Sequence, residues 1–302
     1  MKQSVFRLLC AGLVMSLLAL PAFFSAAAEG VQESPVPHAA GEENSFPDGR
    51  NGTVRLADRT AALPETAEQI RLEPFIPDSL QKVVIGTDDR VAVLKPETYP
   101  YSTVALIEAA GACGHSWTGT GFMIGENDLL TAAHCLFCPE HRMGAERAVF
   151  RFGYRNQRNC LVTYSGEWTA VVGTDFSSGY DSEAMSEDWC FVRFGENIGE
   201  ETGWLGFSTP GDAELNSGFY TVPGYRDEEM KYSAGYAAAY DARLFTCTAD
   251  TVRGYSGGPL LSEDYFAEGI IVAEDTNNQL NIGRRLTPEL LLMMRQEGFG
   301  QD

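Results

Sequence analysis

Three short segments of the chain contain side chains whose types and spacing suit acyl transfer. His134 lies in the segment Leu-Thr-Ala-Ala-His-Cys, Asp188 begins a hydrophobic segment, and Ser256 lies in Gly-Tyr-Ser-Gly-Gly-Pro-Leu. A serine hydroxyl is a poor nucleophile until an imidazole takes its proton, and a carboxylate must hold that imidazole in one tautomer. The sequence therefore predicts Ser256 as nucleophile, His134 as general base and then acid, and Asp188 as the group that orients the histidine.

The order of these motifs separates two folds that place a serine in Gly-x-Ser-x-Gly. In the α/β-hydrolases the catalytic histidine follows the serine, whereas every histidine of this chain precedes Ser256. The order His, Asp, Ser is that of the chymotrypsin group. Backbone N–H groups of Gly254 and Ser256 are then expected to form an oxyanion hole, where each donor contributes about 3 kcal/mol. An ordinary tight turn is the structural alternative for these glycines.

Length and composition limit the class of protein that positions these residues. The 302 residues carry a net charge of −20, which excludes an electrostatic nucleic-acid binder because the phosphate backbone would be repelled. Hydrophobic residues make up 44% of the chain, enough for a packed core. The 31 glycines and 12 tyrosines favour a turn-rich all-β fold over a helical bundle.

Short apolar segments bounded by turn residues predict strands from residue 83 onward. A segment at 189–194 alternates like a half-buried strand, and 270–272 is typical of a fully buried one. Further strands are expected at 83–85, 91–94, 104–107 and 121–124. Helical signals occur at the end of the chain, where Thr287 is the expected N-cap, Pro288 the first helical position and 289–296 the body. The expected architecture is an all-β body closed by a C-terminal helix.

The first 82 residues differ from the remainder. Residues 1–28 have a basic start, an apolar segment and a small-residue cleavage site, which predict a signal peptide and therefore export. A transmembrane anchor is the alternative, but the apolar segment is short for spanning a bilayer and contains Pro21. Residues 29–82 contain six of the 14 prolines and no cysteine. We interpret them as a propeptide, with a flexible linker as the alternative, and residues 83–302 as the folded domain.

Beyond these motifs the chain resembles the bacterial glutamyl endopeptidases, a branch of the trypsin/chymotrypsin superfamily. The resemblance extends over about residues 83–296 and is carried by Val-Ile-Gly-Thr-Asp-Asp-Arg at 84–90, Tyr-Pro-Tyr-Ser at 99–102, Thr-Gly-Thr-Gly-Phe-Met-Ile-Gly at 118–125, the three active-site motifs and Gly-Arg-Arg-Leu-Thr at 283–287. It implies two packed six-stranded β-barrels of the chymotrypsin type, with the site in the cleft between them. Ser256 would come from the second barrel and both of its partners from the first.

The same resemblance assigns a pocket for the P1 side chain, the residue before the cleaved bond. Asp250 lies six residues before Ser256, where trypsin has the pocket-floor carboxylate that selects Arg and Lys, but the glutamyl branch also has Asp-Thr there, like Asp250 and Thr251. For an acidic P1, Thr251 could hydrogen-bond the substrate and Arg253 would lie at the rim. Ile271 instead occupies the place of the histidine that recognises glutamate, and Glu274 would lie near the entrance. We therefore expect no strict glutamyl preference, with basic P1 slightly ahead of acidic P1.

Six cysteines remain outside the signal peptide, and an even number in an exported chain favours disulfides. By the resemblance, Cys113 and Cys135 form the expected pair, because the superfamily joins the strand before the histidine loop to the residue after it. Residues 114–117 are additional between Cys113 and the Thr-Gly that normally follows. A zinc site of Cys135, Cys138 and His141 is the alternative, but it lacks a second half with ligand spacing. No metal and no cofactor are expected.

Together these observations predict a secreted, monomeric serine endopeptidase made as a zymogen. Its substrates would be proteins or peptides, with no nucleic acid as a partner and no membrane association after signal removal. The alternative is a catalytically silent protease-like domain that binds or regulates other proteins. Such domains commonly lose a member of the triad or an oxyanion glycine, and this sequence retains them all.

Overall fold

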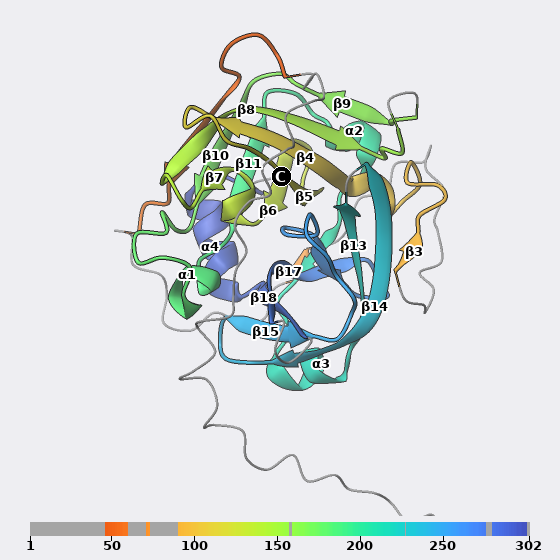
Figure 1. Ribbon diagram of the computed structural model, residues 1–302. Coiled ribbons are helices and arrows are strands. Elements are labelled where there is room, and N and C mark those ends of the chain that lie inside the picture. Colours follow the sequence, from red (N-terminus) through yellow and green to blue (C-terminus); the bar gives the residue numbers. More distant parts are fainter. Residues whose placement is uncertain are drawn as a thin grey trace, which may run out of the picture.

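The computed structural model describes residues 46–59, 71–72, 90–156, 159–226, 228–275 and 280–300. Two packed β-barrels, seen one above the other in Figure 1, make up this part of the chain. The sheet of the first barrel contains β1 (Gly52–Leu56), β4 (Val104–Gly111), β5 (Ser116–Met123), β6 (Asp128–Thr131), β7 (Phe137–Cys138), β8 (Met143–Phe152), β9 (Val162–Tyr164), β10 (Trp168–Val172) and β11 (Cys190–Phe194).

The sheet of the second barrel contains β2 (Arg71–Leu72), β3 (Val91–Ala92), β12 (Gly206–Ser208), β13 (Phe219–Arg226), β14 (Glu229–Ala239), β15 (Leu244–Cys247), β16 (Pro259–Leu261), β17 (Phe266–Asp275) and β18 (Leu280–Arg285). Six of these strands close on themselves in the order β16-β13-β14-β15-β18-β17, because β17 pairs back to β16. In the first barrel the order β10-β11-β6-β5-β4-β8 leaves one gap, between β8 and β10. The predicted fold class is thereby confirmed.

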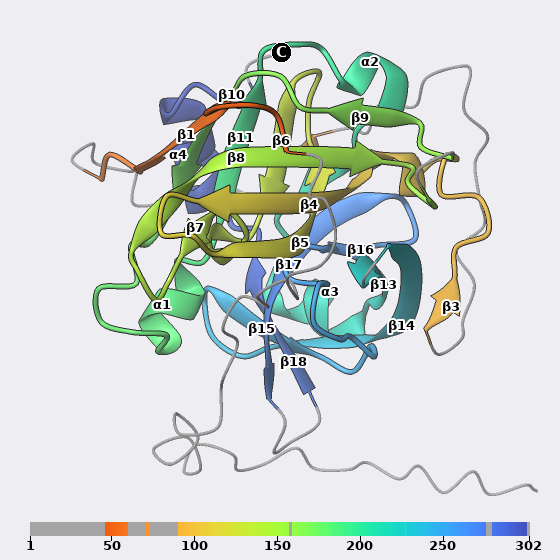
Figure 2. The same cartoon turned by 45° about the horizontal axis from the view of Figure 1, so that its top comes forward.

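Strand β1 fills that gap, although it comes from the segment interpreted as a propeptide. It pairs in parallel with β10, and its other side lies along β8 (Figure 2), where the side-chain amide of Asn51 donates to the carbonyl oxygen of Ala148 at 2.8 Å. A side chain at Gly52 would collide with the ring of Trp168, so glycine permits this close approach. Residues 52–56 are therefore a structural part of the first barrel in this form of the chain.

Helix α4 (Pro288–Gln296) begins and ends as the sequence predicts. Its N-cap Thr287 accepts a hydrogen bond from the backbone N–H of Leu290, and Pro288 occupies the first turn, where no N–H partner is needed. The chain after the helix lies on the first barrel, where the rings of Phe299 and Phe191 are 5.6 Å apart. The C-terminal segment thus connects the two barrels.

The described part of the chain contains three further α-helices, which were not predicted. They are α1 (Ser182–Ser186), α2 (Gly199–Thr202) and α3 (Asp212–Ser217). Each has at most six residues, too short to show the period of 3.6 on which a helix prediction from sequence depends. Among the described residues, no helix combines the length and the apolar character required to cross a lipid bilayer.

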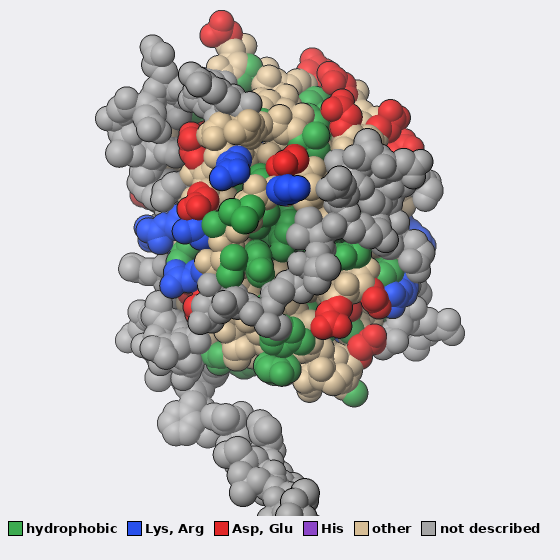
Figure 3. Space-filling view, turned by 90° about the vertical axis from the view of Figure 1, so that its right-hand side faces the viewer, with side chains coloured by type: hydrophobic (Ala, Val, Ile, Leu, Met, Phe, Trp, Pro, Cys, Tyr) green, Lys and Arg blue, Asp and Glu red, His purple; other side chains and the backbone are tan. Residues whose placement is uncertain are grey.

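Most of the predicted strands are present, with shifted ends. The segment 91–94 forms only the two-residue β3, whereas 104–107, 121–124, 189–194 and 270–272 lie in or overlap β4, β5, β11 and β17. The strand expected at 83–85 lies outside the described residues. Figure 3 shows the face near β3 and β14, where acidic side chains gather along one edge and hydrophobic ones occupy the centre.

Candidate active site

His134 is held in the short 3-10 turn Ala133–Cys135 that follows β6. Its backbone N–H donates to Oδ1 of Asp188 at 3.0 Å, and its Nδ1 lies 2.6 Å from Oδ2 of the same carboxylate. Both side chains are buried, so the pair is shielded from water. The two contacts fix the orientation of the imidazole and place the proton on Nδ1, which leaves Nε2 as the basic nitrogen.

Tyr180 is a third member of this hydrogen-bonded group, and the motifs did not reveal it. Its hydroxyl lies 2.6 Å from Oδ2 of Asp188 and 2.8 Å from the carbonyl oxygen of Val272 on β17. The ring stands edge-on to that of His134, with centroids 6.0 Å apart. Tyr180 therefore links the carboxylate from the first barrel to a strand of the second.

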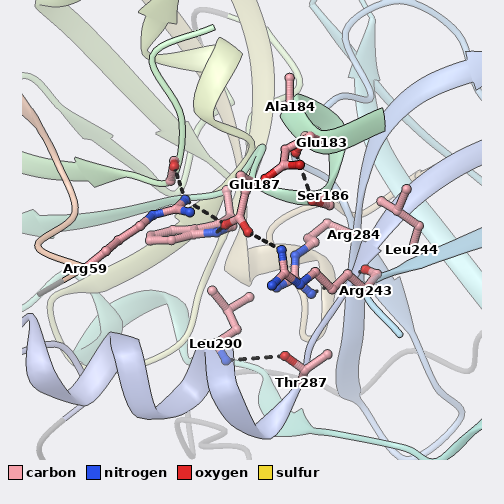
Figure 4. A network of polar contacts seen from close by, with 12 residues as sticks. Arg59, Glu183, Ala184, Ser186, Glu187, Arg243, Leu244, Arg284, Thr287 and Leu290 are labelled. Carbon is pink, nitrogen blue, oxygen red and sulfur yellow. Dashed lines mark hydrogen bonds and ion pairs between the residues drawn. The ribbon is translucent and has the colours of Figure 1, made fainter. Parts of the chain in front are cut away.

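Glu187, next to Asp188 in the chain, anchors this loop through a charged network (Figure 4). Its carboxylate oxygens lie 2.8 Å from Arg59 and 2.7 Å from Arg243, and the indole N–H of Trp189 donates to it at 3.1 Å. Arg284 lies alongside, and its complete burial lowers the pKa of its guanidinium to about 10. Because the carboxylate is mostly buried and multiply bonded, the network holds the backbone that enters Asp188 in place.

The turn that carries Ser256 requires its glycines. Gly254 and Gly257 have φ of 100° and 83°, the left-handed region that side chains disfavour. A Cβ at Gly254 would collide with the carbonyl oxygen of Tyr225, and one at Gly257 with Thr131. A side chain at either position would therefore hinder this turn.

Contacts across the barrel junction hold Ser256 beside the histidine loop. Its carbonyl oxygen accepts hydrogen bonds from the backbone N–H of Thr120 at 2.8 Å and from Sγ of Cys135 at 3.3 Å. The hydroxyl of Thr120 donates to the carbonyl of Gly254 at 2.6 Å. The structure therefore brings the serine turn against the residues that flank His134.

Of the residues predicted to line the P1 pocket, some lie together near its expected place and others do not. Asp250 is not the buried carboxylate that a trypsin-like pocket floor requires, because its side chain is 54% exposed and lies 3.7 Å from Arg90. Thr251 and Glu274 do lie together, with Oγ1 and Oε1 3.5 Å apart. Ile271 is buried in the core of the second barrel, and its backbone pairs with the serine turn.

Several arginines place positive charge near the carboxylate of Glu274. Burial raises the pKa of its carboxyl, while the hydrogen bond with Thr251 and the charges of Arg253, Arg226 and Arg90 act in the opposite direction. The effect of Arg253 on the pKa of Glu274 is consistent with the predicted position of Arg253 near the pocket.

The predicted disulfide between Cys113 and Cys135 is absent, and all six cysteines in the described part of the chain are free thiols. Cys113 lies at the tip of the β4–β5 hairpin. The additional residues 114–117 lengthen this hairpin, whose last paired residues are Ala110 and Ser116. The buried indole of Trp117 donates to the carbonyl of Cys135 at 2.7 Å. Cys135 itself packs against the serine turn, so the two cysteines have different neighbours.

Known proteins similar in sequence to this chain include peptidases. The sequence model of the trypsin-like peptidase domain matches residues 119–270, half of the chain. A glutamyl endopeptidase of Bacillus licheniformis is 28% identical over 189 residues, which cover 60% of this chain and 55% of that protein. The chain thus matches little more than half the length of that relative.

Two further proteins extend the comparison. An extracellular metalloprotease of Bacillus subtilis is 23% identical over 229 residues, 74% of this chain and 72% of that protein. A solved structure of a Glu endopeptidase in complex with MPD superimposes with a TM-score of 0.59 at 23% identity, and covers 71% of this chain and 99% of its own. Together with the family match, these findings show that the chain belongs to the family of trypsin-like peptidase domains and resembles the glutamyl endopeptidase branch.

Proposed function

We propose that the protein is a secreted serine endopeptidase that cleaves peptide bonds through an acyl-enzyme. The observation that carries the proposal is the buried pair of His134 and Asp188, joined at 2.6 Å and packed beside the turn of Ser256. A hydrophobic core does not need a buried carboxylate bonded to Nδ1 of a histidine, whereas a histidine that acts as general base does. Family membership supports the same reaction class.

Each step of the reaction has a residue assigned to it. Nε2 of His134 takes the proton of the Ser256 hydroxyl as Oγ attacks the peptide carbonyl carbon. The resulting oxyanion is stabilised by the backbone N–H groups of Gly254 and Ser256. The imidazolium gives the proton to the leaving amine. Water then attacks the carbonyl carbon of the acyl ester while Nε2 of His134 takes a proton from it, and the imidazolium returns this proton to Oγ of Ser256 as the acid product leaves.

Labelling with a fluorophosphonate probe tests this proposal directly. The mature protein should form one covalent adduct, located on Ser256 by peptide mass spectrometry, and should hydrolyse a peptide library. Heat-unfolded protein is the control, because activation of the hydroxyl depends on the folded arrangement. Folded protein that neither reacts with the probe nor cleaves peptides would instead indicate the catalytically silent binding domain.

For substrate preference we propose basic P1 slightly ahead of acidic P1, with Glu274 in the role expected of Asp250. Glu274 is partly buried beside Thr251, and the neighbouring arginines oppose the effect of burial on its pKa and so favour its charged form. A desolvated carboxylate forms a strong charge-assisted pair with Lys or Arg. Ile271 offers no polar group that could recognise a glutamate side chain.

Replacing Glu274 by Gln should lower kcat/KM for Arg and Lys substrates by about 10- to 100-fold, the range expected for loss of a charged hydrogen bond. The same substitution at the exposed Glu263 is the matched control and should have no effect.

The pH dependence gives a second test. Because binding of a basic P1 requires the charged form of Glu274 and burial raises the pKa of its carboxyl, cleavage after Arg or Lys should decline on acidification at a higher pH than with an ordinary glutamate. A library profile with cleavage almost solely after Glu would refute the preference.

We further propose that the signal peptide of residues 1–28 directs export, and that the propeptide is removed by cleavage after Lys82 or after Val83. The name of the Bacillus subtilis relative, an extracellular protein, supports export. N-terminal sequencing of the active protein should therefore begin at Val83 or Val84. Fully active protein that begins near residue 29 would contradict this processing.

The position of β1 adds an expected result to that experiment. Arg55 pairs with Glu297 at 2.6 Å, and β1 lies between β8 and β10. Cleavage at Lys82 should therefore leave the fragment that contains residues 46–59 bound noncovalently, so that both pieces elute together in gel filtration and separate under denaturing conditions.

A further inference from the structure

A second cluster of reactive side chains lies next to the histidine loop and takes no part in the proposed reaction. It consists of Cys113 and His115 at the tip of the β4–β5 hairpin, Cys138 at the end of β7 and His141 just before β8. In the sequence the two halves are Cys-x-His and Cys-x-x-His, and between them lie strands β5 and β6 and the turn that carries His134. We propose that these four side chains bind a structural zinc ion.

The distances match those of a tetrahedral zinc site. The four candidate ligand atoms all lie within 4.8 Å of one another. Sγ of Cys138 is 3.5 Å from Nδ1 of His141 and 4.0 Å from Nδ1 of His115. Zinc bonds of about 2.3 Å to sulfur and about 2.0 to 2.1 Å to nitrogen place tetrahedral neighbours about 3.6 Å apart, so small side-chain adjustments bring all four donors to bonding distance.

The chemistry of the donors selects the metal and the role. Two thiolates with two imidazoles in tetrahedral arrangement are typical of zinc, whereas calcium and magnesium prefer oxygen ligands. Four protein donors complete the coordination of zinc and leave no position for a substrate or an activated water molecule. The site is therefore structural, and the proposed serine chemistry does not depend on metal chemistry.

The surroundings favour a cation here. Cys138 is buried, Cys113 and His115 are partly buried and His141 is exposed, so the site lies at the surface with Cys138 on its inner side. The rings of His115 and His141 meet edge-on with centroids 4.6 Å apart. Oε2 of Glu140 lies 3.7 Å from Nδ1 of His115, which adds negative charge next to the imidazoles.

The position in the fold indicates what the metal would stabilise. Cys138 belongs to β7, two residues after the turn that carries His134, and β7 pairs with β8 at Cys138 and Met143. The ion would join the hairpin tip to the end of the histidine loop. The sequence predicts a disulfide between these same two segments, with a zinc site that includes Cys135 as the alternative. The structure replaces Cys135 by Cys113 and adds His115, which supplies the missing second half of the site.

Metal analysis of the full chain, purified without chelators in a Ser256→Ala background, tests the proposal. That background prevents self-digestion, so the result does not depend on the proposed activity. Plasma mass spectrometry should find about one zinc ion per chain that withstands gel filtration. Replacing zinc by cobalt should give the thiolate-to-metal absorption band and the strong visible bands of a tetrahedral site. A chelator should lower the thermal midpoint.

Two variants and a control complete the design. Cys138→Ser and the surface change His141→Ala should each weaken zinc binding by more than about 100-fold, because loss of groups that merely support a ligand costs about 10- to 100-fold. His141 is exposed, so its replacement should leave the fold intact. Cys160→Ser is the control, since Cys160 lies outside the cluster and bonds to backbone carbonyls that a serine hydroxyl can also reach. Unchanged zinc content in both variants, or a disulfide between Cys113 and Cys138 in native peptide maps, would overturn the proposal.

Discussion

Replacement of Ser256 by Ala is expected to lower kcat by about 10⁶, because removal of the nucleophile from a serine triad abolishes the acyl-enzyme route. The fold should be unaffected. Ser256 is held through its backbone carbonyl, which accepts from Thr120 and Cys135, and alanine retains that carbonyl. The measurement is steady-state hydrolysis of a good library-derived substrate, with thermal unfolding of both proteins to show equal stability.

A matched serine provides the control for this change. Ser217 lies exposed on α3, and its replacement by Ala should leave both kcat and the thermal midpoint near those of the starting protein. If the Ser256→Ala protein retained activity within about tenfold of wild type, a different group would have to be the nucleophile and the proposed mechanism would be wrong.

The parts of the fold that the sequence predicted are those determined by neighbouring residues. Helix α4 begins at its Thr-Pro signal, and the glycines at 254 and 257 have the backbone conformations that their residue type permits. The all-β class followed from the short apolar segments and the two-barrel arrangement from the family resemblance, and both are confirmed. The triad assignments remain predictions, which the contact of His134 with Asp188 supports.

The features that were missed depend on partners distant in the chain. Strand β1 pairs with β10 more than a hundred residues later, and nothing in its own proline-rich surroundings indicates that pairing. Tyr180 is one of 12 tyrosines, and only the fold brings its hydroxyl to the carboxylate. Asp250 has the chain spacing of a pocket-floor carboxylate, but spacing does not determine burial, and its side chain is 54% exposed beside Arg90.

The four-residue cluster was missed for a related reason. The spacing of Cys135, Cys138 and His141 suggested half of a metal site, whereas Cys113 was considered only as a disulfide partner and His115 was assigned no role. A hairpin turn and a strand pairing place the halves together. Metal sites whose ligands come from two distant turns become recognisable once the tertiary structure is known.

The second large effect is expected for Asp188→Asn, which should lower kcat by about 10⁴ while leaving the shape of the site nearly unchanged. In the starting protein Oδ1 accepts from the backbone N–H of His134, and Oδ2 faces Nδ1 at 2.6 Å. An asparagine must use its oxygen for that N–H, which turns its amide hydrogens toward Nδ1. Nδ1 then becomes the acceptor, the proton moves to Nε2, and the imidazole can no longer take the proton of Ser256.

Two further variants distinguish this tautomer effect from a general loss of charge or packing. Asp181→Asn is the matched control, since Asp181 caps α1 through the N–H of Ala184 and asparagine caps helices equally well; its kcat should stay near wild type. Tyr180→Phe removes one hydrogen bond from Oδ2 but leaves the carboxylate, so its loss should be about 10- to 100-fold, well below that of Asp188→Asn. Comparable losses in the Asp181 and Asp188 variants, measured as kcat across pH, would show that Asp188 does not orient the histidine.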